Sequence, residues 1–322
     1  MMFYIPLLSL QRTKYYRAAL VSPDLVSQRI TEMILKAINS NRIIYSVDFK
    51  AFDASVKYQY IIKAFEYFER CFAPQFGPLL RSVGERLYTI GIVTPIAIFR
   101  GKHGVPSGST FTNEVDSVVQ IGIALTNNFI KEDECQIQGD DGIYIMLEKN
   151  IKDFIARFKY AGLLLEEAKS HIASNYAIFC QCLYHIDYMK DGVIPGIYPT
   201  YRALNRILFQ ERYVNFSKAK IKGKDYYGIR CLSILENCKH HPLFEDLVRF
   251  ILMREKYSLK VSEDGLTKYC TMLSSDSSFV INGGHQYGSD VAGIKNFESY
   301  KIAARIIAEE GLSDNEDDTD IP

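Results

Sequence analysis

The chain has 322 residues, of which 48% are hydrophobic and 13% are aromatic, so it can fill a large core and exceeds one typical domain. Its formal net charge is zero, which excludes a protein that is strongly basic throughout. The longest apolar stretch, residues 87–99, is too short to cross a bilayer, and the first residues lack a basic leader, so we predict no membrane segment and no signal peptide.

The first predicted elements surround an acidic cluster. Apolar residues recur at helical spacing over residues 24–38 and again over residues 58–68, which predicts two amphipathic helices. Between them, the β-branched run over residues 43–47 predicts a strand. This strand ends immediately before the sequence Asp48-Phe-Lys-Ala-Phe-Asp53.

A third helix is predicted over residues 111–123, followed by two short strands over residues 136–139 and 142–146. Asp141 and Gly142 are expected to supply the left-handed dihedrals of the tight turn between these strands. A helix over residues 151–158 and an extended run over residues 163–165 come next. The resulting β-α-β-β-α-β order predicts an α+β fold, with an antiparallel sheet and helices on one face.

Two acidic clusters are predicted to meet at one place, because each lies at the end of a strand. The first contains Asp48 and Asp53, and the second contains Asp140 and Asp141. Carboxylates crowd together only when a positive charge neutralises them, and hard oxygen ligands suit magnesium or manganese. This pattern indicates two-metal phosphoryl transfer.

Three motifs in order resemble those of RNA-dependent RNA polymerases of double-stranded RNA viruses, with picobirnaviruses most similar and partitiviruses next. Residues 48–53 resemble polymerase motif A, residues 104–113 (Gly-Val-Pro-Ser-Gly-Ser-Thr-Phe-Thr-Asn) resemble motif B, and Gly-Asp-Asp-Gly at 139–142 resembles motif C. Residues 196–213 also look picobirnaviral. The resemblance implies the palm of a right-hand polymerase plus a mostly helical thumb, with the fingers largely missing.

This resemblance implies four parts along the chain. Residues 1–40 would be a remnant of the fingers, residues 41–200 the palm with an inserted finger segment, and residues 201–308 the thumb. Residues 309–322 contain seven acidic residues and no basic one, which predicts a disordered tail. Without that tail, 38 basic residues stand against 31 acidic ones, which is compatible with a polyanionic partner.

The resemblance also implies roles for the acidic residues. Asp48 and Asp140 would hold two Mg²⁺ or Mn²⁺ ions, and Asp141 would assist them or act as a ligand. Asp53 would bind the 2′-hydroxyl of the incoming nucleotide, which distinguishes RNA from DNA. Two simpler alternatives exist: a turn-forming Asp-Asp-Gly on a surface hairpin, and Asp53 as the N-cap of the following helix.

Residues of the second motif would contact phosphate or ribose. Ser107 and Ser109 offer hydroxyls and Gly108 lets the backbone approach closely, although the loop could be a flexible connector. Asn113 is the first choice as the partner of Asp53. Many positive-strand viral polymerases carry the amide three residues later, where this chain has Asp116.

Two basic residues are implicated by position. Lys169 stands where the resemblance implies the lysine of motif D, which protonates the leaving pyrophosphate, although it could instead form a surface ion pair beside Glu166 and Glu167. Arg17 resembles a base at the end of motif F that clamps the triphosphate. The alternative for Arg17 is a solvated basic stretch near the terminus.

Other functions are less well supported. Zinc binding is disfavoured because the spacing of the candidate ligands fits no paired-ligand site; these are Cys231, Cys238, His240 and His241. A reverse transcriptase is disfavoured by Asp53, and an inactive RNA-binding fragment stays an alternative because only 47 residues precede Asp48. As partners the resemblance implies template and product RNA, nucleoside triphosphates and a viral capsid protein, in the virion or the host cytoplasm.

Overall fold

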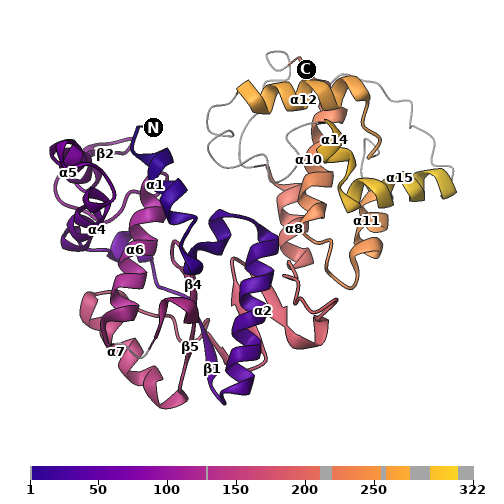
Figure 1. Cartoon of the computed structure of the whole chain (residues 1–322). Helices are drawn as coiled ribbons and strands as arrows, with labels where there is room; N and C mark the ends of the chain where they lie inside the picture. The colour runs from indigo at the N-terminus through magenta and orange to yellow at the C-terminus, as the bar shows by residue number, and fades with distance from the viewer. Residues whose placement is uncertain (1, 128–129, 211–219, 255–258, 276–290, 311–322) are drawn as a thin grey trace. The chain divides into compact units, whose positions relative to one another are not determined.

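The structure is a computed structural model that describes residues 2–127, 130–210, 220–254, 259–275 and 291–310 (Figure 1). The chain divides into two compact units, Met1–Gly196 and Ile197–Pro322. The first unit contains all three motifs.

A four-stranded antiparallel sheet forms the centre of the first unit. Its strand order is β4 (Cys135–Gln138), β5 (Asp141–Met146), β1 (Ile43–Val47) and β6 (His171–Ala173). Successive side chains of a strand point to opposite faces. The two central strands, β1 and β5, carry buried side chains in both registers, so both faces of the sheet are covered at its centre.

Different elements cover the two faces of the sheet (Figure 1). Tyr45 and Tyr144 belong to a core formed with three helices, and Ile44 and Ile143 belong to a separate core on the other face. The first core includes α4 (Tyr58–Arg70), α6 (Thr112–Ala124) and α7 (Ile151–Ala161). The second core includes α2 (Pro23–Asn39) and the hairpin of β7 (Tyr176–Phe179) and β8 (Cys182–His185).

The predicted α+β class with an antiparallel sheet is confirmed, with three differences of detail. Helices cover both faces, because α2 packs opposite α6 and α7. The left-handed residue of the β4–β5 turn is Gly139, with φ of 65°, rather than Asp141 or Gly142. The fourth strand of the sheet is β6. The predicted run at 163–165 contributes only a single bridge, between Phe49 and Leu165, because β1 ends at Val47 before it reaches this point.

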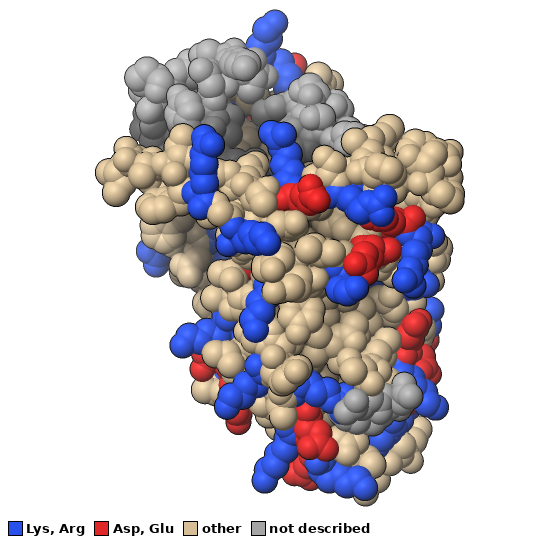
Figure 2. Space-filling view, turned by 90° about the vertical axis from the view of Figure 1, so that its left-hand side faces the viewer, with Lys and Arg blue, Asp and Glu red and all other residues tan. Residues whose placement is uncertain are grey.

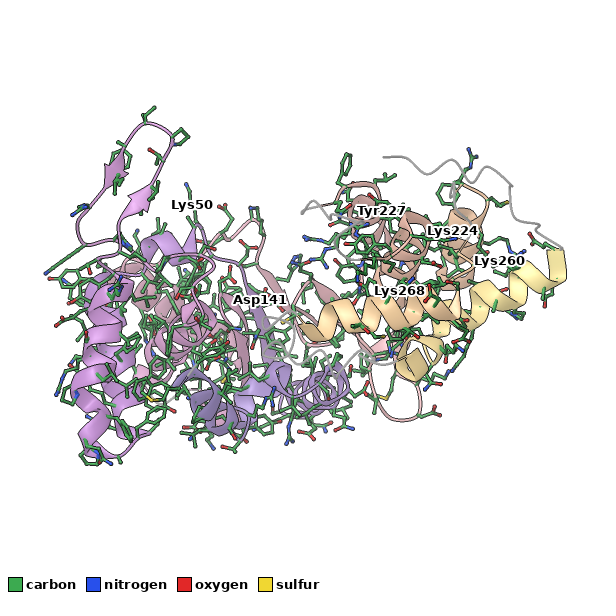
Figure 3. The ribbon with its side chains drawn as sticks, turned by 90° about the horizontal axis from the view of Figure 1, so that it is seen from above. Lys50, Asp141, Lys224, Tyr227, Lys260 and Lys268 are labelled. Atoms are coloured by element: carbon green, nitrogen blue, oxygen red, sulfur yellow. The ribbon has the colours of Figure 1, made fainter. Side chains whose placement is uncertain are left out.

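Shorter elements complete the first unit: α1 (Tyr4–Gln11), the 3₁₀ segment η1 (Tyr15–Leu20), α3 (Phe52–Ser55), η2 (Pro74–Phe76), α5 (Gly77–Leu87), β2 (Ile92–Val93), β3 (Ile98–Phe99), η3 (Leu125–Asn127), η4 (Glu132–Glu134), η5 (Glu148–Asn150) and η6 (Ile186–Tyr188). The β2–β3 hairpin projects from the rest of this unit (Figure 3). Its strands pair only with each other, and its apolar side chains are exposed.

The second unit is helical where the structure describes it. It contains α8 (Thr200–Leu208), α10 (Gly223–Glu236), α11 (Phe244–Leu252), α12 (Glu263–Ser275), α14 (Val291–Lys295) and α15 (Glu298–Glu310). A small core joins α10, α12 and α14 through Ile229, Leu266 and Ile294. Most of the predicted acidic tail, residues 311–322, lies outside the described residues, and its first two residues end α15. Among the described helices, none has the length and apolar character needed to cross a membrane.

Candidate active site

The register of β1 and β5 brings the two acidic clusters to one edge of the sheet. Val47 pairs with Gly142 in this antiparallel ladder. Asp48 follows Val47 and Asp141 precedes Gly142, so the same register sets these two aspartates opposite each other. Asp140 lies in the β4–β5 turn beside them. Figure 3 labels Asp141 and Lys50, which mark this part of the first unit.

The backbone of Asp48 is held from both sides by the segment that carries Lys169. The Glu166 N–H donates to the Asp48 carbonyl at 2.8 Å, and the Asp48 N–H donates to Ser170 Oγ at 3.2 Å. The exposed Lys169 lies between these two contacts. Among the ion pairs formed by the described residues, none includes Lys169. The alternative reading of Lys169, a surface ion pair with Glu166 or Glu167, is therefore not seen among the described residues.

The pKa of Asp140 is raised, as expected for a carboxyl group in a crowded acidic site. Partial burial of its carboxyl group raises its pKa, and the charges of Asp53 and Asp48 raise that pKa further. Backbone N–H groups of Asp140 and Asp141 act in the opposite direction. The carboxylates of both sequence clusters therefore interact in the fold.

Asp116 faces Asp53. Burial, the charge of Asp53 and a hydrogen bond with it raise the pKa of Asp116 to about 9, with a smaller contribution from Asp140. The α6 residue whose carboxyl group interacts with Asp53 is therefore Asp116, whereas Asn113 was the first choice from the sequence. The N-cap alternative for Asp53 is wrong, because Ala51 caps α3 and Lys57 caps α4.

The donor set fits a divalent cation in its chemistry. Asp48, Asp53 and Asp140 offer hard oxygen atoms, and their mutual repulsion is what a cation would relieve. In the part of the chain that is described, however, no three His, Cys, Asp or Glu side chains are already arranged as a metal site. A bound ion would therefore need further oxygen ligands, such as water, to complete its coordination.

The loop of the second motif is attached to the first motif through backbone contacts. The Val105 N–H donates to the Asp53 carbonyl at 2.8 Å. A Cβ atom on Gly104 would lie only 2.3 Å from that same oxygen, so the close approach requires glycine. The start of the loop is therefore held in place, and the alternative of a flexible connector is wrong for this part of it. Ser107 and Gly108 are exposed at its tip, and Gly108 is left-handed, with φ of 93°.

Ser109 is half-buried and begins the turn that leads into α6. The Thr112 N–H donates to the Ser109 carbonyl at 3.2 Å, and Thr112 Oγ1 donates to the Pro106 carbonyl at 2.8 Å. These bonds link the loop rigidly to the first turn of α6. The predicted unit of loop and helix start is therefore present, with Asn113 in that first turn.

One face of α6 is polar and packs against the Gly-Asp-Asp-Gly turn. It consists of Asn113, Asp116, Ser117 and Gln120, whose spacing of three and four places them on one side of a helix. The Gly139 N–H donates to Ser117 Oγ at 2.8 Å, and Gln120 Nε2 donates to the Asp140 carbonyl at 3.4 Å.

Sequence reasoning missed Ser117 and Gln120. Both are completely buried. The signal that could have revealed them is a polar stripe at helical spacing next to the apolar stripe that defined the helix. Gly142 is explained by the same packing, because a Cβ atom there would lie 2.4 Å from Gln120 Nε2.

Arg17 lies elsewhere than its predicted role suggests. Its Nη2 atom is 2.6 Å from Glu114 Oε1, and both side chains are completely buried. The alternative of a solvated basic stretch is therefore wrong for Arg17. Its contact with α6 is structural in this conformation, and a triphosphate contact remains a prediction.

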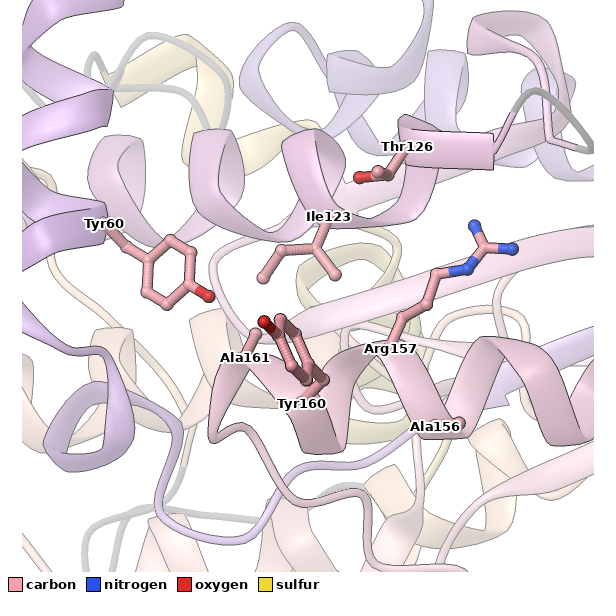
Figure 4. Close-up of a pocket in the computed structure, with 7 residues that line it drawn as sticks. All are labelled: Tyr60, Ile123, Thr126, Ala156, Arg157, Tyr160 and Ala161. Carbon is pink, nitrogen blue, oxygen red and sulfur yellow. The ribbon is translucent and has the colours of Figure 1, made fainter.

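Other features of the described part do not include these acidic residues. A surface pocket of about 410 Å³ is lined by α4, α6, η3 and α7 (Figure 4), and its lining residues are Tyr60, Ile123, Thr126, Ala156, Arg157, Tyr160 and Ala161. On the face shown in Figure 2, basic and acidic side chains are interspersed over much of the surface. Cys231 and Cys238, two of the zinc candidates, are buried in the second unit.

Comparison with known proteins decides the family. A family model described as viral RNA-dependent RNA polymerase matches residues 18–215, which include all three motifs and the polar face of α6. The chain belongs to the viral RNA-dependent RNA polymerase family. A potential RNA-dependent RNA polymerase of a human picobirnavirus is 29% identical over 265 residues, covering 77% of this chain.

Solved polymerase structures share the fold. The crystal structure of the RNA-dependent RNA polymerase of a human picobirnavirus matches 94% of this chain with a TM-score of 0.77 and 26% identity. An insertion-loop deletion mutant of such a polymerase matches with a TM-score of 0.75 and 26% identity. The chain spans 47% of the picobirnavirus sequence relative and 58% of the first of these structures.

Proposed function

We propose that this chain carries the palm active site of a viral RNA-dependent RNA polymerase, which joins ribonucleoside triphosphates on an RNA template. The observation that carries the proposal is the β1–β5 register, in which Val47 pairs with Gly142 and both acidic clusters share one sheet edge. Family membership supports the same chemistry. Residues 41–200 would act as the palm, residues 201–308 as the thumb and residues 1–40 as part of the fingers.

Asp48 and Asp140 would hold two Mg²⁺ or Mn²⁺ ions, with Asp141 as an additional ligand or a neighbouring support. Such ions, when bound, lower the pKa of the primer 3′-hydroxyl and neutralise the charge that develops on the leaving pyrophosphate. The raised pKa of Asp140 beside Asp53 and Asp48 supports this assignment.

Recognition of the incoming nucleotide would fall to the residues around Asp53. This carboxylate can accept a hydrogen bond from a ribose 2′-hydroxyl. Asp116 on α6 interacts with it, and Asn113 lies one turn earlier on the same helix face. Ser107, Gly108 and Ser109 would approach phosphate or ribose from the loop, since two of them lie exposed at its tip.

Two basic residues would act on the phosphates. Lys169 would protonate the leaving pyrophosphate, and its segment is hydrogen-bonded to the Asp48 backbone on both sides. Arg17 would assist triphosphate binding only if its pair with Glu114 opens. RNA template, RNA product and nucleoside triphosphates are the proposed partners. A capsid protein and a location in the virion or host cytoplasm are proposed from the resemblance alone.

Primer extension on an RNA template tests the proposal. Asp140→Asn removes charge without changing shape, so we expect incorporation to be lost while the fold is retained. Asp48→Asn should have the same effect, and the double variant should be no worse than either single one, because each change disables the same unit. Extension by Asp140→Asn at the wild-type rate would contradict the metal assignment. RNA binding without extension by the wild type would favour an inactive RNA-binding fragment.

A further inference from the structure

Ser117 occupies a position that connects two parts of the candidate site. Its side chain is completely buried in the middle of α6. Its Oγ atom is 2.8 Å from the Gly139 backbone nitrogen and 3.1 Å from Asn113 Oδ1. Gly139 begins the turn that carries Asp140, and Asn113 is a candidate nucleotide contact. A single hydroxyl therefore joins the acidic turn to the helix that faces the nucleotide.

The direction of each hydrogen bond follows from the chemistry of the groups. A backbone N–H can only donate, so Ser117 Oγ must accept from Gly139. The single hydroxyl proton of Ser117 is donated to Asn113 Oδ1 at 3.1 Å. The amide NH₂ of Asn113 consequently points away from Ser117. With its oxygen occupied by Ser117, Asn113 keeps its NH₂ group free to donate to another partner.

Neighbouring contacts strengthen the same attachment. Gln120 Nε2 donates to the Asp140 carbonyl one helical turn beyond Ser117. A Cβ atom on Gly139 would lie 3.8 Å from Asn113 Oδ1, so helix and turn are in van der Waals contact. Gly139 is also left-handed, a conformation that glycine adopts without steric cost. The hydrogen bond from Gly139 to Ser117 therefore helps to select this conformation of the turn.

We infer that Ser117 is a positioning residue, which sets both the place of the Asp140 turn and the orientation of the Asn113 amide. This inference rests on the proposed polymerase function. It adds that metal affinity and ribose selection are coupled through one buried hydroxyl. Ser117 itself touches neither metal nor nucleotide.

The test compares Mn²⁺ binding by the whole chain and its variants, measured by electron paramagnetic resonance of the free ion. Ser117→Ala should weaken Mn²⁺ binding by about tenfold, as expected for the loss of one buried hydrogen bond. Ser117→Thr keeps the hydroxyl and should recover binding. Ser46→Ala is the matched control, because Ser46 Oγ is also buried and accepts a backbone N–H, from Ile178 at 2.9 Å.

A second readout is the ratio of ribonucleotide to deoxyribonucleotide incorporation in single-turnover reactions. Ser117→Ala should lower both this ratio and Mn²⁺ affinity. Asn113→Asp keeps an acceptor for Ser117 but loses the donor, so it should lower the ratio, and its added negative charge should not weaken Mn²⁺ binding. Equal weakening by Ser46→Ala, unchanged Mn²⁺ binding in Ser117→Ala, or a folded Ser117→Thr that stays impaired would each overturn the inference. If neither the wild type nor any variant extends primers, the polymerase proposal fails. The Mn²⁺ measurement then tests the role of Ser117 by itself.

Discussion

Arg17 and Glu114 form an ion pair of 2.6 Å in which neither side chain has any exposed surface. The pair joins η1, near the start of the chain, to α6, the helix that supports the acidic turn. Burial raises the pKa of Glu114, and the charge of Arg17 only partly opposes this effect. Removing Glu114 and removing Arg17 should therefore lower the stability of the protein by different amounts.

Glu114→Gln should destabilise the protein more than Arg17→Met. A glutamate left alone can take up a proton, whereas an arginine cannot release one. Leaving a buried charge unpaired typically costs about 3–5 kcal/mol, and we expect Glu114→Gln to approach that value in chemical denaturation. The exposed pair Lys63–Glu66 is the control, and Lys63→Met should cost under about 1 kcal/mol. Equal losses for the two buried variants would contradict this asymmetry.

The stability of the protein should fall as the pH rises, and Asp116 should cause this decline. Its pKa rises from an ordinary value of 3.8 to about 9 in the fold, so the folded state favours the protonated form. The stability contributed by that proton is fully present below about pH 4 and is lost as the pH rises toward 9. Asp116→Asn cannot ionise and should flatten this decline. Thermal melting from pH 5 to 9, in a chelator that removes divalent ions, is the measurement; parallel curves would rule out the shift.

Asp53→Ala should reduce the preference for ribonucleotides more than it reduces turnover. A hydrogen bond to a charged group contributes about 1.5–3 kcal/mol, which corresponds to roughly 10- to 100-fold in discrimination. The measurement is incorporation efficiency for both nucleotide types in one assay. Because Asp53 caps neither α3 nor α4, a lost cap cannot explain the result. An unchanged ratio would remove Asp53 from ribose recognition.

Residues 1–322 should position a nucleoside triphosphate poorly. The chain spans about half of its picobirnavirus sequence relative, and Arg17 is occupied by Glu114. Misplacing a reacting group by about 1 Å can cost on the order of 10²-fold in rate. We therefore expect residues 1–322 to elongate primers far more slowly than the longer picobirnavirus polymerase at equal concentration and salt. Comparable rates would show that residues 1–322 suffice for catalysis.

The local sequence determined the elements of the central sheet and the residues at its edge. Periodic apolar residues predicted α2, α4, α6 and α7 because burial of one helical face depends on spacing within a short segment. β-branched runs before Asp48 and around Asp140 predicted β1, β4 and β5 in the same way. The three family motifs, and their order along the chain, predict the acidic site without any knowledge of contacts.

Only the tertiary structure decided which polar side chains meet. Arg17 is 97 residues from Glu114, and Ser117 is 22 residues from Gly139. Burial of a polar group is tolerated only when a partner is found, and that partner is chosen by how helix and sheet pack. No periodic pattern encodes such a choice. The interaction of Asp53 with Asp116 likewise depends on which face of α6 packs against the sheet edge.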